Sequence, residues 1–145
     1  MLAAAKRLEE ILNSVPARLL SFTEQQASVK PAPGKWSKKE IIGHLLDSAS
    51  NNHQRFVRLQ LENNPPLPNY EQDNWVSLQK YNERKWVDLV KFWMIYNIHL
   101  LHVLQNADES KFQNAAVMDG KPVTLLFFID DYVRHLAHHL KAVLN

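Results

Sequence analysis

The chain has 145 residues, of which 17 are basic and 15 acidic, and its formal net charge is +2. This length suits one domain with its own hydrophobic core. The absence of cysteine excludes disulfide scaffolds and thiolate metal sites, so any metal must be held by nitrogen or oxygen. The charges are mixed along the chain without a basic block, which argues against nucleic-acid binding.

Two further classes of protein are excluded by pattern. The three glycines do not form the phosphate-binding motif of P-loop or dinucleotide-binding proteins. Residues 1–10 lack the apolar core of a signal peptide, and no run approaches the roughly 18 apolar residues of a membrane span. We therefore expect a cytoplasmic protein that acts on a small molecule and not on nucleic acid or membrane.

The first predicted helix covers residues 2–27, where apolar residues recur at helical spacing between charges. Pro16 stands in its middle, where it must kink the helix or make it restart after Asn13 or Ser14. Residues 28–35 contain two prolines and a glycine and are predicted to form a loop.

The second predicted helix begins at Ser37 and runs to about Asn63. Ser37 and Glu40 have the form of a capping box, in which a hydroxyl and a carboxylate satisfy free backbone N–H groups at a helix start. On the helical wheel a polar stripe follows the edge of the apolar face: His44, Ser48, Asn51 and Arg55. This stripe is either a solvated flank or the lining of a site, with His44 as a candidate ligand.

Residues 64–74 form a proline-rich loop, and a third helix is predicted from Trp75 or Val76 to Asn106. One stripe repeats along this helix at steps of three and four: Asn82, Trp86, Leu89, Trp93, Tyr96, Leu100 and Val103. An aromatic stripe at helical spacing is most simply core, although it could also wall a substrate pocket.

Residues 107–122 form a second long connection, in which Asp119 and Gly120 favour the turn of a short hairpin. Thr124 then caps the last helix, which runs to Asn145. Four helices with two long connections predict an all-α fold, a four-helix bundle that fills residues 1–145 as a single domain. Metal sites in such bundles are commonly built from side chains on facing helices.

The last helix carries three histidines, His135, His138 and His139. His135 and His139 are four residues apart and share a face. His139 takes the place of a leucine in the apolar stripe and His135 lies on its flank, whereas His138 falls on the solvent side. A buried imidazole without a partner costs about 1 to 3 kcal/mol. The pair therefore indicates either hydrogen-bonded core histidines or a metal site, and a third ligand from another helix would decide.

Four segments now fall into one order: residues 34–37 (GKWS), 44–48 (HLLDS), the loop 68–75 (PNYEQDNW), and 132–139 (YVRHLAHH). Their order and spacing resemble the DinB-like superfamily, and within it the YfiT-like branch of metal-dependent hydrolases and bacillithiol transferases. The resemblance covers nearly the whole chain. It implies a four-helix bundle that holds one divalent metal ion, nickel or zinc, by His44, His135 and His139. It also implies a homodimer formed by helix packing.

Three functions follow as hypotheses. The first is a thiol S-transferase that acts on small electrophiles, with a small-molecule thiol as co-substrate because the chain has no cysteine. Candidates to line the approach to the metal are Asn51, Arg55, Tyr70, Asp73 and Trp75. The second is a metal-dependent hydrolase, with Asp47 or Asp131, both assigned to polar flanks, as the base. The third is a bundle that binds a metal or a ligand without turnover.

Overall fold

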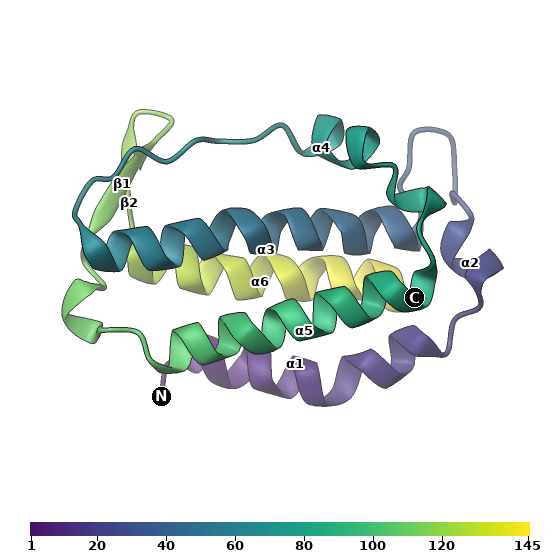
Figure 1. Cartoon of the computed structure of the whole chain (residues 1–145), viewed down its shortest axis with the longest axis horizontal. Coiled ribbons are helices and arrows are strands. Elements are labelled where there is room, and N and C mark those ends of the chain that lie inside the picture. The colour runs from purple at the N-terminus through teal and green to yellow at the C-terminus, as the bar shows by residue number, and fades with distance from the viewer.

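The computed structural model describes residues 1–145 and contains four long helices: α1 (Ala3–Leu20), α3 (Lys38–Leu61), α5 (Trp86–Gln105) and α6 (Leu125–Leu144). They form a bundle in which α3 packs between α6 and α5, and α1 packs against α5 and α6 (Figure 1). The connections hold two short helices, two 3-10 turns and a hairpin: α2 (Glu24–Ser28), α4 (Gln72–Gln79), η1 (Tyr81–Glu83), η2 (Glu109–Lys111), β1 (Ala115–Met118) and β2 (Lys121–Thr124). The predicted all-α four-helix bundle is confirmed.

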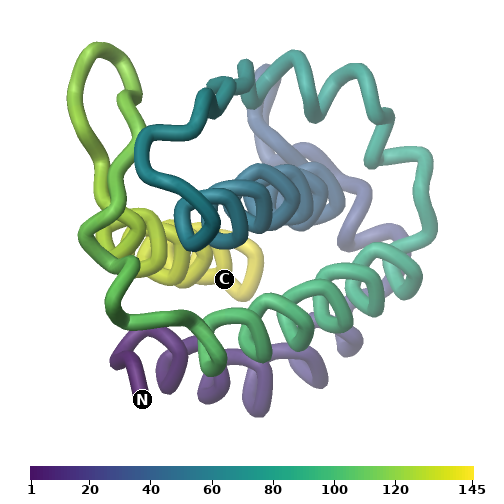
Figure 2. Tube along the Cα trace, turned by 60° about the vertical axis from the view of Figure 1, so that its left-hand side comes forward, coloured from purple at the N-terminus to yellow at the C-terminus, as the bar shows by residue number.

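The order of the helices places two parallel helices side by side in this bundle. Figures 1 and 2 show that α3 and α5 run in the same direction, while α1 and α6 run in the opposite one. Parallel neighbours cannot be joined by a short turn, because the chain must return along the full length of the first helix. The connection that carries α4 makes this return and passes over α3 (Figure 1).

Local signals placed three boundaries correctly. At the start of α3, the Ser37 hydroxyl accepts from the Glu40 backbone N–H at 3.2 Å, and the Glu40 carboxylate accepts from the Ser37 N–H at 3.1 Å. Thr124 caps α6 by accepting from the Phe127 N–H at 3.2 Å. Asp119 and Gly120 both have positive φ and form the turn between β1 and β2, as the predicted hairpin requires.

The first predicted helix is too long. It ends at Leu20, and a second capping box starts α2: the Thr23 hydroxyl accepts from the Gln26 N–H at 3.1 Å, and the Gln26 side chain accepts from the Thr23 N–H at 2.9 Å. Pro16 lies inside α1, which is continuous across it. Of the two predicted alternatives, a kink or a restart after Asn13 or Ser14, the restart is excluded.

The third predicted helix is also wrong in its first part. Lys80 adopts a left-handed conformation, with φ of +50°, and this ends α4. The 3-10 turn at Tyr81–Glu83 and the extended Arg84 follow, and α5 begins at Trp86. From Trp86 onward the predicted aromatic stripe is confirmed as core, because Trp86 and Trp93 are fully buried and Tyr96 is half-buried.

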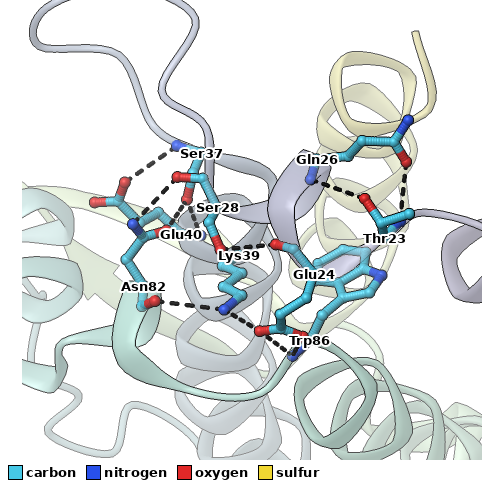
Figure 3. A network of polar contacts seen from close by, with 9 residues as sticks. All are labelled: Thr23, Glu24, Gln26, Ser28, Ser37, Lys39, Glu40, Asn82 and Trp86. Carbon is cyan, nitrogen blue, oxygen red and sulfur yellow. Dashed lines mark hydrogen bonds and ion pairs between the residues drawn. The ribbon is translucent and has the colours of Figure 1, made fainter.

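One polar network joins the ends of several elements (Figure 3). The Glu24 carboxylate of α2 accepts from the Trp86 N–H at the start of α5, at 2.9 Å, and forms an ion pair with Lys39 of α3. The Lys39 ammonium also donates to the Asn82 carbonyl at 3.4 Å. This network satisfies the free N–H group at the start of α5, whose own N-cap residue provides no side-chain hydrogen bond.

The expectation that no segment could span a membrane needs a correction. By length and composition, α5 is apolar enough to cross a membrane, with a mean hydropathy of 1.2. In this structure its inner face is buried against α1 and α3, and core helices of bundles share that composition.

The crossover is anchored on α3 at Gly43, and a methyl group there is expected to destabilise the fold. A Cβ at Gly43 would overlap the aromatic ring of Tyr81. We expect Gly43→Ala to lower the free energy of unfolding by about 1 to 3 kcal/mol through overpacking. Urea denaturation measures this value. Ser50→Ala on the same helix, where the hydroxyl bonds only to the Asp47 carbonyl, is the control, and an equal effect of both would contradict the steric explanation.

Candidate metal centre

Three histidines meet between two facing helices. α3 provides His44, and α6 provides His135 and His139 one turn apart. The Nε2 atoms of His44 and His135 are 3.2 Å apart, and those of His139 and His135 are 3.1 Å apart. One ligand nitrogen from each of the three rings lies within 4.8 Å of the others. The structure thus brings together the three histidines that the resemblance predicted. His44 and His135 meet although they are 91 residues apart in sequence.

The burial of the histidines of α6 agrees with the helical wheel, and the burial of His44 excludes the solvated-flank alternative for this residue. His44 is only 1% exposed, and His135 and His139 are half-buried. His138 is exposed, as predicted. The ring of Trp36, in the loop before α3, lies 4.9 Å from the His44 ring and closes one side of the cluster. In the sequence Trp36 stands in the GKWS motif directly before the helix cap, and this position was the available signal for its role.

The three imidazoles are neutral at physiological pH. Burial, together with the neighbouring His135 and His139, lowers the pKa of His44 to about 3. Burial and the other histidines lower the pKa of His139 to about 4. Burial also lowers the pKa of His135, although the charge of Asp131 opposes this effect. Neutral imidazole is the form that binds metal ions.

The spacing of the nitrogens fits a bound cation. Zinc–nitrogen bonds of about 2.0 to 2.1 Å at angles between 90° and 109° place neighbouring nitrogens about 2.9 to 3.4 Å apart. The two Nε2 separations fall in this range. Hydrogen bonds among the rings explain the cluster less well, because the Nε2 atom of His135 lies within 3.2 Å of both other Nε2 atoms but has only one hydrogen or one lone pair to share between them. The residues present therefore fit a divalent ion with nitrogen ligands.

A cavity gives access to the cluster from one side. His139 lines a hollow of about 570 Å³ between the loop before α3 and the C-terminal end of α6. Trp36, Ile41 and Ala142 provide apolar wall, and Lys35 and Lys38 provide positive charge. A small molecule that enters this hollow reaches the edge of the histidine cluster.

None of the predicted pocket residues lines the hollow beside His139. Asn51 and Arg55 lie on the same face of α3 as His44, two and three turns further along, and line a separate cavity of about 270 Å³. The ring of Tyr70 packs against that of Trp75 at 5.2 Å, and Asp73 is exposed on the first turn of α4. Their proposed role in the approach to the metal stays a prediction.

The two candidate bases differ from each other. Asp47 is buried, so its assignment to a polar flank is wrong. Its Oδ1 atom accepts from the Tyr81 hydroxyl at 2.6 Å and from the Gln79 amide at 2.7 Å, and burial raises the pKa of its carboxyl group. Asp131 is half-buried and forms an ion pair with Arg134. Asp47 therefore anchors the crossover, and neither carboxylate is hydrogen-bonded to the histidines.

Comparison with known proteins agrees with this fold and cluster. A family model described as the DinB superfamily matches residues 7–143. Relatives from Bacillus mycoides (strain KBAB4) and Bacillus cereus (strain AH820), each named "Putative metal-dependent hydrolase", are 24% identical over 136 residues, which cover 92% of this chain and 78% of theirs. The structure of YfiT from Bacillus subtilis, described as a probable metal-dependent hydrolase with an unusual four-helix bundle topology, superposes with a TM-score of 0.81. That match has 21% identity and covers 96% of this chain and 83% of YfiT.

The lowered pKa values predict that the metal-free protein loses stability in acid. Between the ordinary histidine value of 6.5 and the folded values of about 3 and 4, the unfolded chain binds protons that the native His44 and His139 do not. Stability should therefore fall as the pH decreases from 7 toward 4. Urea midpoints in the presence of a chelator measure the slope.

His139→Leu should flatten this slope because it removes one of the groups that must stay neutral. His138→Leu is the control, because this exposed ring should leave the slope unchanged. An identical slope for wild type and His139→Leu would mean that the native cluster already accepts protons near pH 5 and would contradict the assigned burial effect.

Proposed function

Since this chain belongs to the DinB superfamily, we propose that it is a metal-dependent enzyme whose divalent ion is held by His44, His135 and His139. The observation that carries this proposal is the convergence of three neutral Nε2 atoms, at 3.1 and 3.2 Å, from two facing helices. Imidazole ligands suit nickel and zinc, the two ions we propose. Three protein ligands also leave a position free for a substrate, as in catalytic sites.

We further propose that the nucleophile is a small-molecule thiol. A bound divalent ion supplies a Lewis acid that lowers the pKa of such a group. Asp47 is hydrogen-bonded to Tyr81 and Gln79, and Asp131 is paired with Arg134, so these carboxylates have other partners than a reacting group. A thiol, with an ordinary pKa of about 8.5, can release its proton to solvent near neutral pH without a dedicated base. Water is a much weaker acid, so a hydrolytic reaction depends more on a dedicated base.

The hollow beside His139 suits the electrophilic substrate. Trp36 and Ile41 can cover an apolar part of a small molecule, while Lys35 offers a charge that attracts an anionic group. Lys38 is held in place, since its ammonium donates to the carbonyls of Val143 and Asn145. In the proposed transfer the thiol sulfur forms a bond to carbon, the leaving group departs with its electron pair, and the thiol proton passes to solvent.

Hydrolysis at the same centre is the second candidate. It is favoured by the names of the relatives and by Asp131, whose negative charge reaches His135. In that reaction Asp131 would have to leave Arg134 and act as the base.

Metal content tests the centre itself. We expect about one equivalent of nickel or zinc in tag-free wild-type protein, measured by elemental analysis after exposure to each ion. His44→Ala, His135→Ala and His139→Ala should each lose it, because two imidazoles hold the ion much less tightly than three. His138→Ala is the matched control and should keep it. Wild type that stays empty would reduce the three histidines to core polar residues, and the enzyme proposal would fall with them.

The choice of nucleophile has its own test. The metal-loaded protein should accelerate the reaction of a small thiol with a chloro-nitroaromatic electrophile, followed by absorbance, and the acceleration should vanish in His139→Ala. An activated ester without thiol tests hydrolysis, in wild type and in Asp131→Asn. If the wild-type protein cleaves the ester in a way that depends on Asp131 but does not accelerate the thiol reaction, the hydrolase is supported and the transferase is overturned.

A further inference from the structure

A second cavity lies between the C-terminal half of α3 and the proline-rich segment of the crossover. Its volume of about 270 Å³ is near the lower end of the range for small-molecule pockets. The lining residues come from these two segments alone: Asn51, Gln54, Arg55 and Arg58 of α3, and Pro66, Leu67 and Pro68 of the crossover. The four residues of α3 share one face of the helix. Because the lining holds two arginines and no acidic residue, the cavity is positively charged.

The Arg55 guanidinium has almost no polar partner within the chain. Its one hydrogen bond goes to the side-chain oxygen of Asn52, at 3.4 Å, although a guanidinium has five N–H donors. Neither Arg55 nor Arg58 forms an ion pair, since the three ion pairs of the chain join other residues. Arg55 is half-buried, and burial lowers its pKa, although arginine stays protonated at neutral pH. A positive charge that has lost part of its water is stabilised by a bound anion.

Neighbouring side chains hold both arginines in place. The guanidinium carbon of Arg55 lies 4.9 Å from the centre of the Phe128 ring of α6. Such a contact uses the flat side of a guanidinium and leaves its N–H edge free for hydrogen bonds. Arg58 donates from Nε to the side-chain oxygen of Gln54 at 2.7 Å. Most of the terminal N–H groups of the two arginines therefore remain free to bind a ligand.

We propose that this cavity binds the oxyanion end of a small organic molecule, a carboxylate or a phosphate, and that Arg55 recognises it. The planar fork of a guanidinium matches both groups, because it donates two parallel N–H bonds to two oxygen atoms. The opposite wall, formed by Pro66, Leu67 and Pro68, suits the uncharged body of the molecule. An inorganic ion would use only the arginine side of the cavity, whereas an organic oxyanion uses both sides.

The proposed site is separate from the candidate metal centre. Arg55 follows His44 by eleven residues of α3, so their Cα atoms are about 16 Å apart along the helix axis. Tyr70 of the crossover covers the interval between them. Burial raises the pKa of its hydroxyl, and Arg55 and Ser48 both oppose this effect, so the phenol lies close to both residues. A ligand held by Arg55 through its oxyanion does not need a metal ion, and the proposal does not rest on the proposed function.

Calorimetric titration of chelator-treated protein tests the proposal, because an anion cannot then bind to a metal ion at the histidines. Phenyl phosphate and benzoate present the two oxyanions on the same apolar ring, and inorganic phosphate presents the ion alone. We expect saturable binding of phenyl phosphate or benzoate with a Kd of about 1 mM or below. The tighter of the two identifies the preferred oxyanion. Inorganic phosphate should bind at least about fivefold more weakly, because it makes no contact with the apolar wall.

Substitutions at Arg55 show whether its fork recognises the ligand. Arg55→Gln should weaken binding at least about tenfold, and Arg55→Lys, which keeps the charge but loses the fork, should weaken it severalfold. Arg7→Gln is the matched control and should bind as wild type does. Arg7 is an exposed residue of α1, and α1 lies on the opposite side of the bundle from the crossover (Figures 1 and 2). Wild type without saturable binding, or Arg55→Gln that binds equally well, overturns the proposal.

A measurement on the wild-type protein avoids dependence on a variant that fails to fold, since Arg55 also packs on Phe128. In NMR spectra the ligand should shift the side-chain N–H signal of Arg55 and the backbone N–H signal of Leu67. The backbone signals of Lys35 and His139 should stay unchanged. Shifts confined to Lys35 and His139 would assign the anion to the hollow beside the histidines and overturn the proposal. So would inorganic phosphate that binds as tightly as phenyl phosphate, because the apolar wall would then recognise nothing.

Discussion

The packing of α3 against α6 is the contact on which the candidate site depends. It brings three imidazoles together away from water. Protonation of these rings is unfavourable there, because each positive charge would lose solvation and lie beside two others. The fold therefore keeps all three histidines neutral, with the pKa of His44 lowered to about 3. Neutral Nε2 atoms held this close together, with no carboxylate hydrogen-bonded to them, can bind a cation. Burial thus keeps these rings in the neutral form that binds metal ions.

The crossover between α3 and α5 is fixed on a neighbouring face of α3. Two contacts fix the returning chain to α3. The Tyr81 hydroxyl donates a buried hydrogen bond to Asp47, and the Tyr81 ring packs closely against Gly43. Asp47 lies three residues from His44, about 60° away around the helix. Its carboxylate accepts from Tyr81 and Gln79 of the crossover, so it contributes to the topology and not to the centre. The Glu24 and Lys39 pair fixes the end of the crossover in the same way, by joining α2, α3 and the start of α5.

The sequence predicted those features that depend on local chemistry. Capping residues placed the starts of α3 and α6, and helical periodicity separated His139 from His138 without any tertiary information. The errors lie where tertiary contacts override local preference. Lys80 ends α4 in a left-handed conformation that its side chain does not favour, because Tyr81 is drawn into the core. The burial of Asp47 was unpredictable for a related reason: its partners lie 32 and 34 residues away in a segment that periodicity had assigned to one helix.

The two sides of α3 separate the candidate metal centre from the packing against α5. His44 and His53 are nine residues apart, which at about 100° per residue places them on opposite sides of the helix. His44 meets α6, and His53 meets Tyr96 of α5. A bound metal ion would hold α3 against α6, while the contact between His53 and Tyr96 holds its opposite side against α5. The two contacts stabilise the same helix without competing for the same surface.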